Sequence, residues 1–405
     1  MTAPSRQRPR AVALLPYAEE RLGRFLSDLA ELVAVDSGSY SPSGVNRVAD
    51  WTAARLAAIG FTVERVTPAR TADGRQTGDV LVARKTGRLS AGAGGRRILL
   101  VAHMDTVFQD GTAAERPFAV RGSLAHGPGV SDDKGGLLAG LTALEILAET
   151  GVEEYGELVF LATPDEEIGS PASRAVTERA ARGAHYALAL ECARENGDLV
   201  IARKGVADFL LTVTGRAAHS GIEPERGANA ALTAAHLVVE LQALNGRWDG
   251  VTVNVGVVRA GTRTNIVCPE AELRVEVRSV TASGIVRAWK AIEEAAARPA
   301  VPGTGVEVER LDLCPPMEDT VASHHVLAHA RALAAELGIP LGAVATGGVG
   351  DANIIAGAGV PTLDGLGPVG GADHTPEEWL DTATVPSRIA LLASLVATLG
   401  DSRNG

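Results

Sequence analysis

Residues 96–107, RRILLVAHMDTV, form a continuous apolar run that ends in polar side chains. Two further segments have the same form, ELVFLATPDEE at 157–167 and HYALALE at 185–191. Apolar runs without alternation are typical of strands that are buried on both faces of a sheet. Because a helix is expected over 134–149, between the first two runs, the sequence predicts an α/β domain with a mostly parallel sheet flanked by helices.

The pattern changes after residue 204. Strands are expected at 206–216, 251–261, 270–280 and 306–313, and helices at 228–244 and 281–297. This order, β-α-β-β-α-β, is that of a ferredoxin-like unit. We therefore expect three parts, namely a flexible tail (1–16), a discontinuous catalytic domain (17–204 and 314–405) and an inserted lid or dimerisation domain (205–313).

Composition narrows the class of protein. The 405 residues carry a formal net charge of -11, which argues against nucleic acid or an anionic membrane as a partner. No apolar run approaches the roughly 18–20 residues of a membrane span. The three cysteines, Cys192, Cys268 and Cys314, are far apart in the sequence, which fits a reducing compartment and predicts a cytoplasmic location.

Histidine and carboxylate side chains follow the apolar runs. Taken singly, each has a structural alternative, such as a helix N-cap or a solvated loop. In α/β sheets, however, the carboxyl ends of the strands collect functional groups. Imidazole and carboxylate ligands suit zinc, and also cobalt or manganese, while five ligands are too many for one tetrahedral zinc with an open position. The sequence therefore predicts two metal ions held by His103, Asp132, Glu167, Glu191 and His374.

Five segments together resemble a known family. They are HMDTV (103–107), GPGVSDDKGG (127–136), PDEEIGS (164–170), ALE (189–191) and DHTPEEW (373–379). The family is that of the two-zinc hydrolases acetylornithine deacetylase, succinyl-diaminopimelate desuccinylase, aminoacylase and glutamate carboxypeptidase. The resemblance covers about residues 25 to 395 and is strongest to the glutamate carboxypeptidase branch.

The resemblance implies a role for each metal-site residue. Asp132 is similar to the ligand that bridges both zinc ions, and in relatives its peptide bond to the next residue is cis. His103 and Glu191 match the other ligands of one ion, and Glu167 and His374 those of the second. Glu166 matches the general base. Asp105 matches the residue that orients His103, since it can accept the second ring N–H of this histidine.

Further roles fall on the inserted domain and the loop after it. The segment GRAAHSG (215–221) matches the one that supplies an oxyanion-stabilising histidine from a partner subunit, which makes His219 the candidate. Substrate contacts are expected from Arg278, Asn265, Gly348 and Asp351. Relatives often carry an arginine where this chain has Cys314, so a glutamate-type or folate-like substrate is in doubt.

Together these features predict a zinc-dependent amidohydrolase or metallopeptidase. The expected substrate is an N-acyl amino acid or a short peptide with a free carboxylate, cut in the manner of a carboxypeptidase. Two alternatives stay open: a biosynthetic N-acyl amino-acid deacylase or desuccinylase, and a non-catalytic metal-binding relative. A homodimer formed through the lid domain is also expected, because an exposed sheet edge can pair with its copy.

Overall fold

The apolar runs of the sequence become neighbouring strands of one sheet. The computed structural model describes residues 11–402, which divide into two units. The first unit comprises residues up to 201, 319–346 and 350 onward, and the second comprises 202–318 and 347–349. Within the described residues, no helix combines the length and the apolar character needed to cross a membrane.

The first unit is a mixed α/β structure built on a six-stranded sheet. In spatial order its strands are β1 (Thr62–Val66), β2 (Val80–Thr86), β6 (Glu157–Thr163), β3 (Arg97–His103), β7 (Tyr186–Ala189) and β14 (Thr362–Leu363). Parallel pairing joins β6, β3, β7 and β14, whereas β1 and β2 pair antiparallel at one edge. The parallel part carries the polar residues singled out in the sequence.

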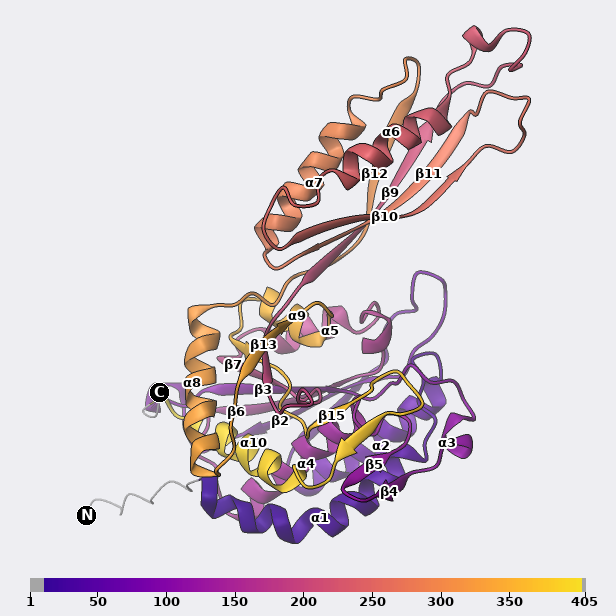
Figure 1. Cartoon of the computed structure of the whole chain (residues 1–405). Coiled ribbons are helices and arrows are strands. Elements are labelled where there is room, and N and C mark those ends of the chain that lie inside the picture. The colour runs from indigo at the N-terminus through magenta and orange to yellow at the C-terminus, as the bar shows by residue number, and fades with distance from the viewer. Residues whose placement is uncertain (1–10, 403–405) are drawn as a thin grey trace. The chain divides into compact units, whose positions relative to one another are not determined.

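Helices cover both faces of this sheet (Figure 1). The helices of this unit are α1 (Ala11–Val33), α2 (Pro42–Ala58), α3 (Thr112–Glu115), α4 (Lys134–Glu149), α5 (Arg174–Ala181), α8 (Val321–Glu336), α9 (Asp351–Gly357) and α10 (Val385–Leu399). The helix expected over 134–149 is confirmed as α4, which is buried along most of its length. Sequence patterning did not reveal α10, because this helix is buried on every side and so lacks a polar face.

Two smaller sheets complete the fold of this part of the chain. One contains β15 (Gly370–Gly371), β16 (Trp379–Asp381), β5 (Leu124–His126) and β4 (Ala119–Arg121). The other pairs β13 (Ala343–Thr346) with β8 (Leu199–Arg203). The first of them brings the late loop around His374 beside the loop that precedes α4, since β16 pairs with β5.

The expected tail requires a correction. Residues 1–10 lie outside the described part of the chain, but residues 11–16 form the first turns of α1. Ala11 and Leu14 are buried, and the Ala11 N–H donates to Glu336 at 3.1 Å. Pro16 removes only the hydrogen bond to the carbonyl of Val12, an exposed residue, so the apolar stripe of the helix continues past the proline.

The second unit follows the order β9 (Gly205–Thr214), α6 (Ala230–Gln242), β10 (Val251–Ala260), β11 (Glu270–Ser279), α7 (Ala282–Ala296) and β12 (Gly305–Cys314). Its antiparallel sheet has the spatial order β10-β11-β9-β12. Both helices pack on one face of this sheet, over a core that includes Phe209, Leu273 and Ile292 (Figure 1). Along β11, polar residues from Glu270 to Arg278 alternate with the buried ones and so lie on the opposite face.

Candidate active site

The candidate site lies where three parallel strands of the first unit end. His103 is the last residue of β3, which pairs with β6 and β7 on its two sides. The acidic segment 165–167 follows β6, and Glu191 follows β7. Parallel strands deliver their carboxyl ends to the same sheet edge, so side chains that are distant in sequence meet there.

The five predicted metal ligands form two groups that share Asp132. One group contains His103, Asp132 and Glu191, and the other contains Asp132, Glu167 and His374. In each group, one potential ligand atom per residue lies within 4.8 Å of the others. The structure therefore brings together all five residues, and the shared carboxylate is the one that the resemblance identified as bridging.

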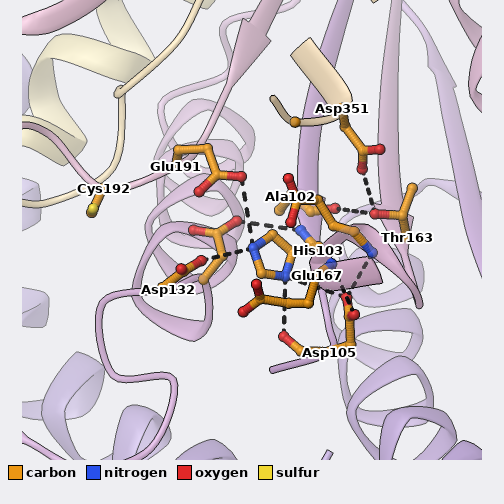
Figure 2. A network of polar contacts seen from close by, with 12 residues as sticks. Ala102, His103, Asp105, Asp132, Thr163, Glu167, Glu191, Cys192 and Asp351 are labelled. Atoms are coloured by element: carbon orange, nitrogen blue, oxygen red, sulfur yellow. Dashed lines mark hydrogen bonds and ion pairs between the residues drawn. The ribbon is translucent and has the colours of Figure 1, made fainter. Parts of the chain in front are cut away.

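Asp132 uses a different oxygen for each histidine. Its Oδ1 lies 2.9 Å from His103 Nε2, and its Oδ2 lies 3.0 Å from His374 Nε2. His374 Nε2 is also 3.0 Å from Glu167 Oε2. His103 Nε2 is 3.6 Å from Glu191 Oε1. Figure 2 shows the His103 ring between Asp132 and Glu191 on one side and Asp105 on the other.

The loop that carries Asp132 has an unusual backbone. The peptide bond between Asp132 and Asp133 is cis, as in the family that the sequence resembles. Asp133 is buried, and its Oδ2 accepts the backbone N–H of His103 at 3.3 Å. This hydrogen bond joins the end of β3 to the start of α4, so Asp133 contributes to the site through the backbone rather than as a ligand.

Asp105 contacts the ring of His103 mainly through its backbone. His103 Nδ1 is 3.0 Å from the Asp105 carbonyl oxygen and 3.4 Å from its Oδ1. The carboxylate itself accepts the backbone N–H groups of Glu166 and Glu167, at 3.1 and 3.2 Å, and the hydroxyl of Ser39 at 2.6 Å. Asp105 thus both orients the histidine and fixes the acidic turn after β6.

Glu378 is a residue of the site that the sequence reading missed. Its buried carboxylate accepts the backbone N–H groups of Gly129, Ser131 and Asp132, at 2.9, 2.8 and 3.1 Å. Burial raises the pKa of Glu378 to about 7, against the opposing effect of these N–H donors. The available signal was an acidic residue directly before the apolar pair Trp379-Leu380, inside a segment already singled out.

The electrostatics of the cluster favour a cation. Burial raises the pKa of Glu166 well above its usual range, and the charge of Glu191 adds to the rise. Hydrogen bonds from His103 and His374 outweigh burial and lower the pKa of Asp132. Hydrogen bonds to Asp132 and Glu167 raise the pKa of His374 to about 10. The carboxylates of Asp132 and Glu167 therefore stabilise a positive charge placed next to them. A metal ion requires such an environment.

Three other residues predicted for the site, His219, Asn265 and Gly348, belong to the second unit. His219 and Asn265 are exposed in the second unit, where a bridge joins His219 to Ile266 and the Ser220 N–H donates to the Asn265 carbonyl at 3.1 Å. The exposed Gly348 accepts from Arg203 at 3.4 Å.

Arg278 and Asp351 are both engaged inside their own units. The Arg278 Nε and Nη2 atoms donate to Glu276 at 2.8 and 2.9 Å, and its Nη1 donates to the Gly347 carbonyl at 2.9 Å. Asp351 was expected at the substrate, but it is buried. Its carboxylate accepts the hydroxyl of Thr163 (Figure 2) and also that of Ser170. This geometry fits a role in bracing the end of β6.

Comparison with known proteins agrees with this fold. The sequence model of Peptidase family M20/M25/M40 matches residues 99–398. The chain belongs to this family of hydrolases and is therefore an enzyme, as the resemblance of the five segments implied.

Two relatives with different names illustrate the similarity of the chain to other members of this family. The chain is 33% identical to carboxypeptidase G2 of Pseudomonas sp. (strain RS-16), over 96% of the chain and 92% of that protein. It is 31% identical to acetylornithine deacetylase of Myxococcus xanthus, over 62% of the chain and 66% of that protein. Among solved structures, aminopeptidase PepT from Bacillus cereus ATCC 10987 shares the fold, with a TM-score of 0.71, 23% identity and coverage of 93% and 98%.

Proposed function

We propose that this enzyme is a two-zinc hydrolase that cleaves the amide bond of an N-acyl amino acid or a short peptide with a free carboxylate. The observation that carries the proposal is that Asp132 belongs to both ligand groups, while the neighbouring Glu166 belongs to neither. A shared carboxylate suits two metal ions, and an acid that is left out of both groups is available for proton transfer.

The donor set fits zinc. Each group offers one imidazole nitrogen and two carboxylate oxygens, a set that leaves positions open for water and substrate. Glu167 Oε1 is buried and has no hydrogen-bond partner, as expected of an oxygen placed to bind an ion. When bound, zinc would lower the pKa of a coordinated water and polarise the amide carbonyl.

The protein's own residues supply the remaining steps. Glu166 accepts a proton from the attacking water and gives a proton to the departing amine. Its position is fixed by the hydrogen bond from its backbone N–H to Asp105. Arg278 is the proposed partner of the substrate carboxylate, because Glu276 occupies one edge of its guanidinium and leaves N–H bonds on both terminal nitrogens.

A panel of N-acyl amino acids tests the proposal. With zinc supplied, the wild type should release free amine from at least one member, and Glu166→Gln should keep its metal but turn over about 100- to 10,000-fold more slowly. Glu178→Gln, which alters an exposed glutamate of α5, is the matched control. Failure of the wild type on every member, or full activity of Glu166→Gln, contradicts the proposal.

We also propose that the second unit forms a homodimer and that His219 serves the active site of the partner subunit. The β-α-β-β-α-β order of this unit and its edge strand β10 support pairing of two copies. A mixture of His219→Ala and Glu166→Gln chains tests this arrangement. Random heterodimers would hold one complete site and recover about a quarter of wild-type activity. No recovery in mixed dimers would contradict action across the interface.

Biosynthetic N-deacylation is the second candidate. It is supported by the similarity to acetylornithine deacetylase, a protein named for removal of an acetyl group. The same panel separates the two candidates, because a deacylase of this kind should prefer small acyl groups.

A further inference from the structure

Arg388 of α10 is a buried arginine that the proposed chemistry does not use. The residue is 2% exposed, and its guanidinium donates to three backbone carbonyls. Nε donates to Gly367 at 3.0 Å, Nη1 to Gly197 at 3.1 Å, and Nη2 to Gly365. Within the described residues no carboxylate pairs with it, and burial lowers the pKa of Arg388 to about 10. A cation buried without a counter-charge is costly, so its contacts identify the segments that it stabilises.

Two of these carbonyls belong to an irregular extension of the main sheet. Strand β14 pairs parallel with β7 up to Leu363, which lies opposite Leu188. The pairing resumes beyond both strands, where Val369 forms a parallel bridge with Ala193. Between these two pairs the chain after β14 advances six residues, whereas the chain after β7 advances five. The extra residue makes a β-bulge, and Gly365 within it has a φ of +75°, which glycine adopts without strain.

The candidate metal ligand Glu191 lies opposite this bulge. Its carbonyl accepts the Gly367 N–H at 2.9 Å, and the carbonyl of Ala189 accepts the Leu366 N–H at 3.2 Å. The approach is close, because a Cβ atom at Gly367 would lie 2.9 Å from the carbonyl oxygen of Glu191. The same glycine therefore joins the guanidinium of Arg388 to the backbone of the ligand.

The third carbonyl belongs to the turn that follows the ligand segment. Gly197 has a φ of +83°, and its N–H donates to the Arg194 carbonyl at 2.6 Å. The Arg194 N–H donates in turn to the Asp198 carbonyl at 3.1 Å, which closes the turn. Arg388 thus holds the chain that follows Glu191 as well as the bulge beside it.

We propose that Arg388 is a positioning residue that keeps the bulge and the turn in register with Glu191, and so directs this ligand at one of the two metal ions. Bulges redirect nearby side chains, and a slip of one residue would turn the Glu191 side chain to the other face of the sheet. The inference rests on the proposed two-metal centre. The loop of His374, a ligand of the other ion, is held separately, because Gly370 and Gly371 pair with β16.

Two proteins with one intact ligand group each test the proposal. His374→Gln leaves intact the group that contains Glu191, and Glu191→Gln leaves intact the group that contains His374. Competition with a chelator measures zinc affinity in each. Adding Arg388→Lys to His374→Gln should lower this affinity about 10- to 100-fold, because one amine replaces three donors to the supporting segments. In the Glu191→Gln protein the same change should stay within about 3-fold.

Two further variants separate positioning from a general loss of stability. Leu395→Ala removes a buried side chain about two turns further along α10. It should lower the urea midpoint without a selective effect on either protein. Gly365→Ala strains the left-handed bulge while Arg388 remains, and it should repeat the selective loss of zinc affinity. This variant tests the proposal even if Arg388→Lys does not fold.

Hydrogen exchange of zinc-free protein adds a readout that needs no metal. Exchange in residues 189–193 and 364–369 should be at least about 10-fold faster in Arg388→Lys than in the wild type. The same change of zinc affinity in both proteins, or faster exchange without any loss of affinity, overturns the positioning role. If neither protein binds zinc, the proposed metal centre and the inference are both overturned. A selective loss of affinity, with no turnover of the substrate panel by the wild type, supports the inference and contradicts only the proposed hydrolysis.

Discussion

Glu378 accepts the backbone N–H of Asp132, a residue 246 positions earlier in the chain, at 3.1 Å. The same carboxylate also receives the N–H groups of Gly129 and Ser131. Three donors that would otherwise be buried without partners are thus satisfied by one side chain. This arrangement fixes the loop that presents the shared ligand of both groups.

Replacing Glu378 with glutamine should weaken both the fold and the metal site. Glutamine offers one acceptor oxygen, and its amide would point N–H bonds at backbone donors. We expect the free energy of unfolding to fall by about 2 kcal/mol, the cost of a buried donor left unpaired. Zinc affinity should fall about 10- to 100-fold, as for other residues that support a ligand. Chemical unfolding and zinc titration measure these changes, and Glu377→Gln is the exposed control. A Glu378→Gln protein that matches this control in both measurements would refute the role.

Asp132→Asn should impair both ligand groups at once. Because each histidine faces a different oxygen of this carboxylate, loss of its charge removes a ligand from each proposed ion. We expect affinity for both zinc equivalents to fall by more than about 100-fold, beyond the effect of a supporting residue. Elemental analysis after dialysis against buffered zinc measures the content, with Asp50→Asn as an exposed control. Retention of one equivalent with unchanged affinity would rule out a shared ligand.

Arg278→Met should impair substrates that carry a free carboxylate. Loss of a charge-assisted hydrogen bond is expected to lower kcat/KM about 10- to 100-fold. The amide of the same substrate should lose less, because it carries no charge for the guanidinium. Arg274→Met is a close control, since Arg274 lies on the same strand and pairs with Glu272 at 3.1 Å. Equal losses in the two variants would argue against the assignment.

Lys134→Met should change how stability depends on pH. Burial lowers the pKa of Lys134 to about 8, although its Nζ donates to the Val35 carbonyl at 2.8 Å. Between that pKa and the ordinary value of 10.5, the unfolded chain binds more protons than the folded one, so stability rises with pH in this window. The wild type should gain up to about 1.4 kcal/mol per pH unit relative to the variant between pH 8 and 10.

Urea unfolding of chelator-treated protein at pH 7, 8, 9 and 10 measures this difference. Lys85→Met is the matched control, because Lys85 is less buried and also donates to a backbone carbonyl, that of Ile59, at 2.9 Å. A constant stability difference between wild type and Lys134→Met over the four pH values would contradict the expected shift.

Local pattern and chemistry made much of this molecule predictable. The strand β3 and the helix α4 follow directly from an apolar run and from helical spacing. The five ligands could be collected because each follows a strand or lies in a segment of distinctive composition. In contrast, α10 has no polar face, and the partners of Glu378 are backbone groups distant in sequence. Neither an all-apolar helix nor a backbone hydrogen bond leaves a periodic signal in the residues themselves.

The pairing of Arg278 with Glu276 is a different case. Residues two apart on a strand share a face, so the pair was accessible from the sequence. The sequence does not predict that both oxygens of Glu276 accept hydrogen bonds from Arg278. This pairing determines which N–H bonds of the guanidinium stay available for a substrate.

The early start of α1 has a practical consequence for handling this enzyme. A chain shortened to begin at Tyr17 would look like one freed of a dispensable leader, yet it would lack Ala11 and Leu14, which are buried. The Ala11 N–H also donates to Glu336 of α8, so the cut would remove this tie and expose the apolar surface that Ala11 and Leu14 cover. Such a protein would be prone to aggregate, and loss of activity in it would report on solubility rather than on chemistry.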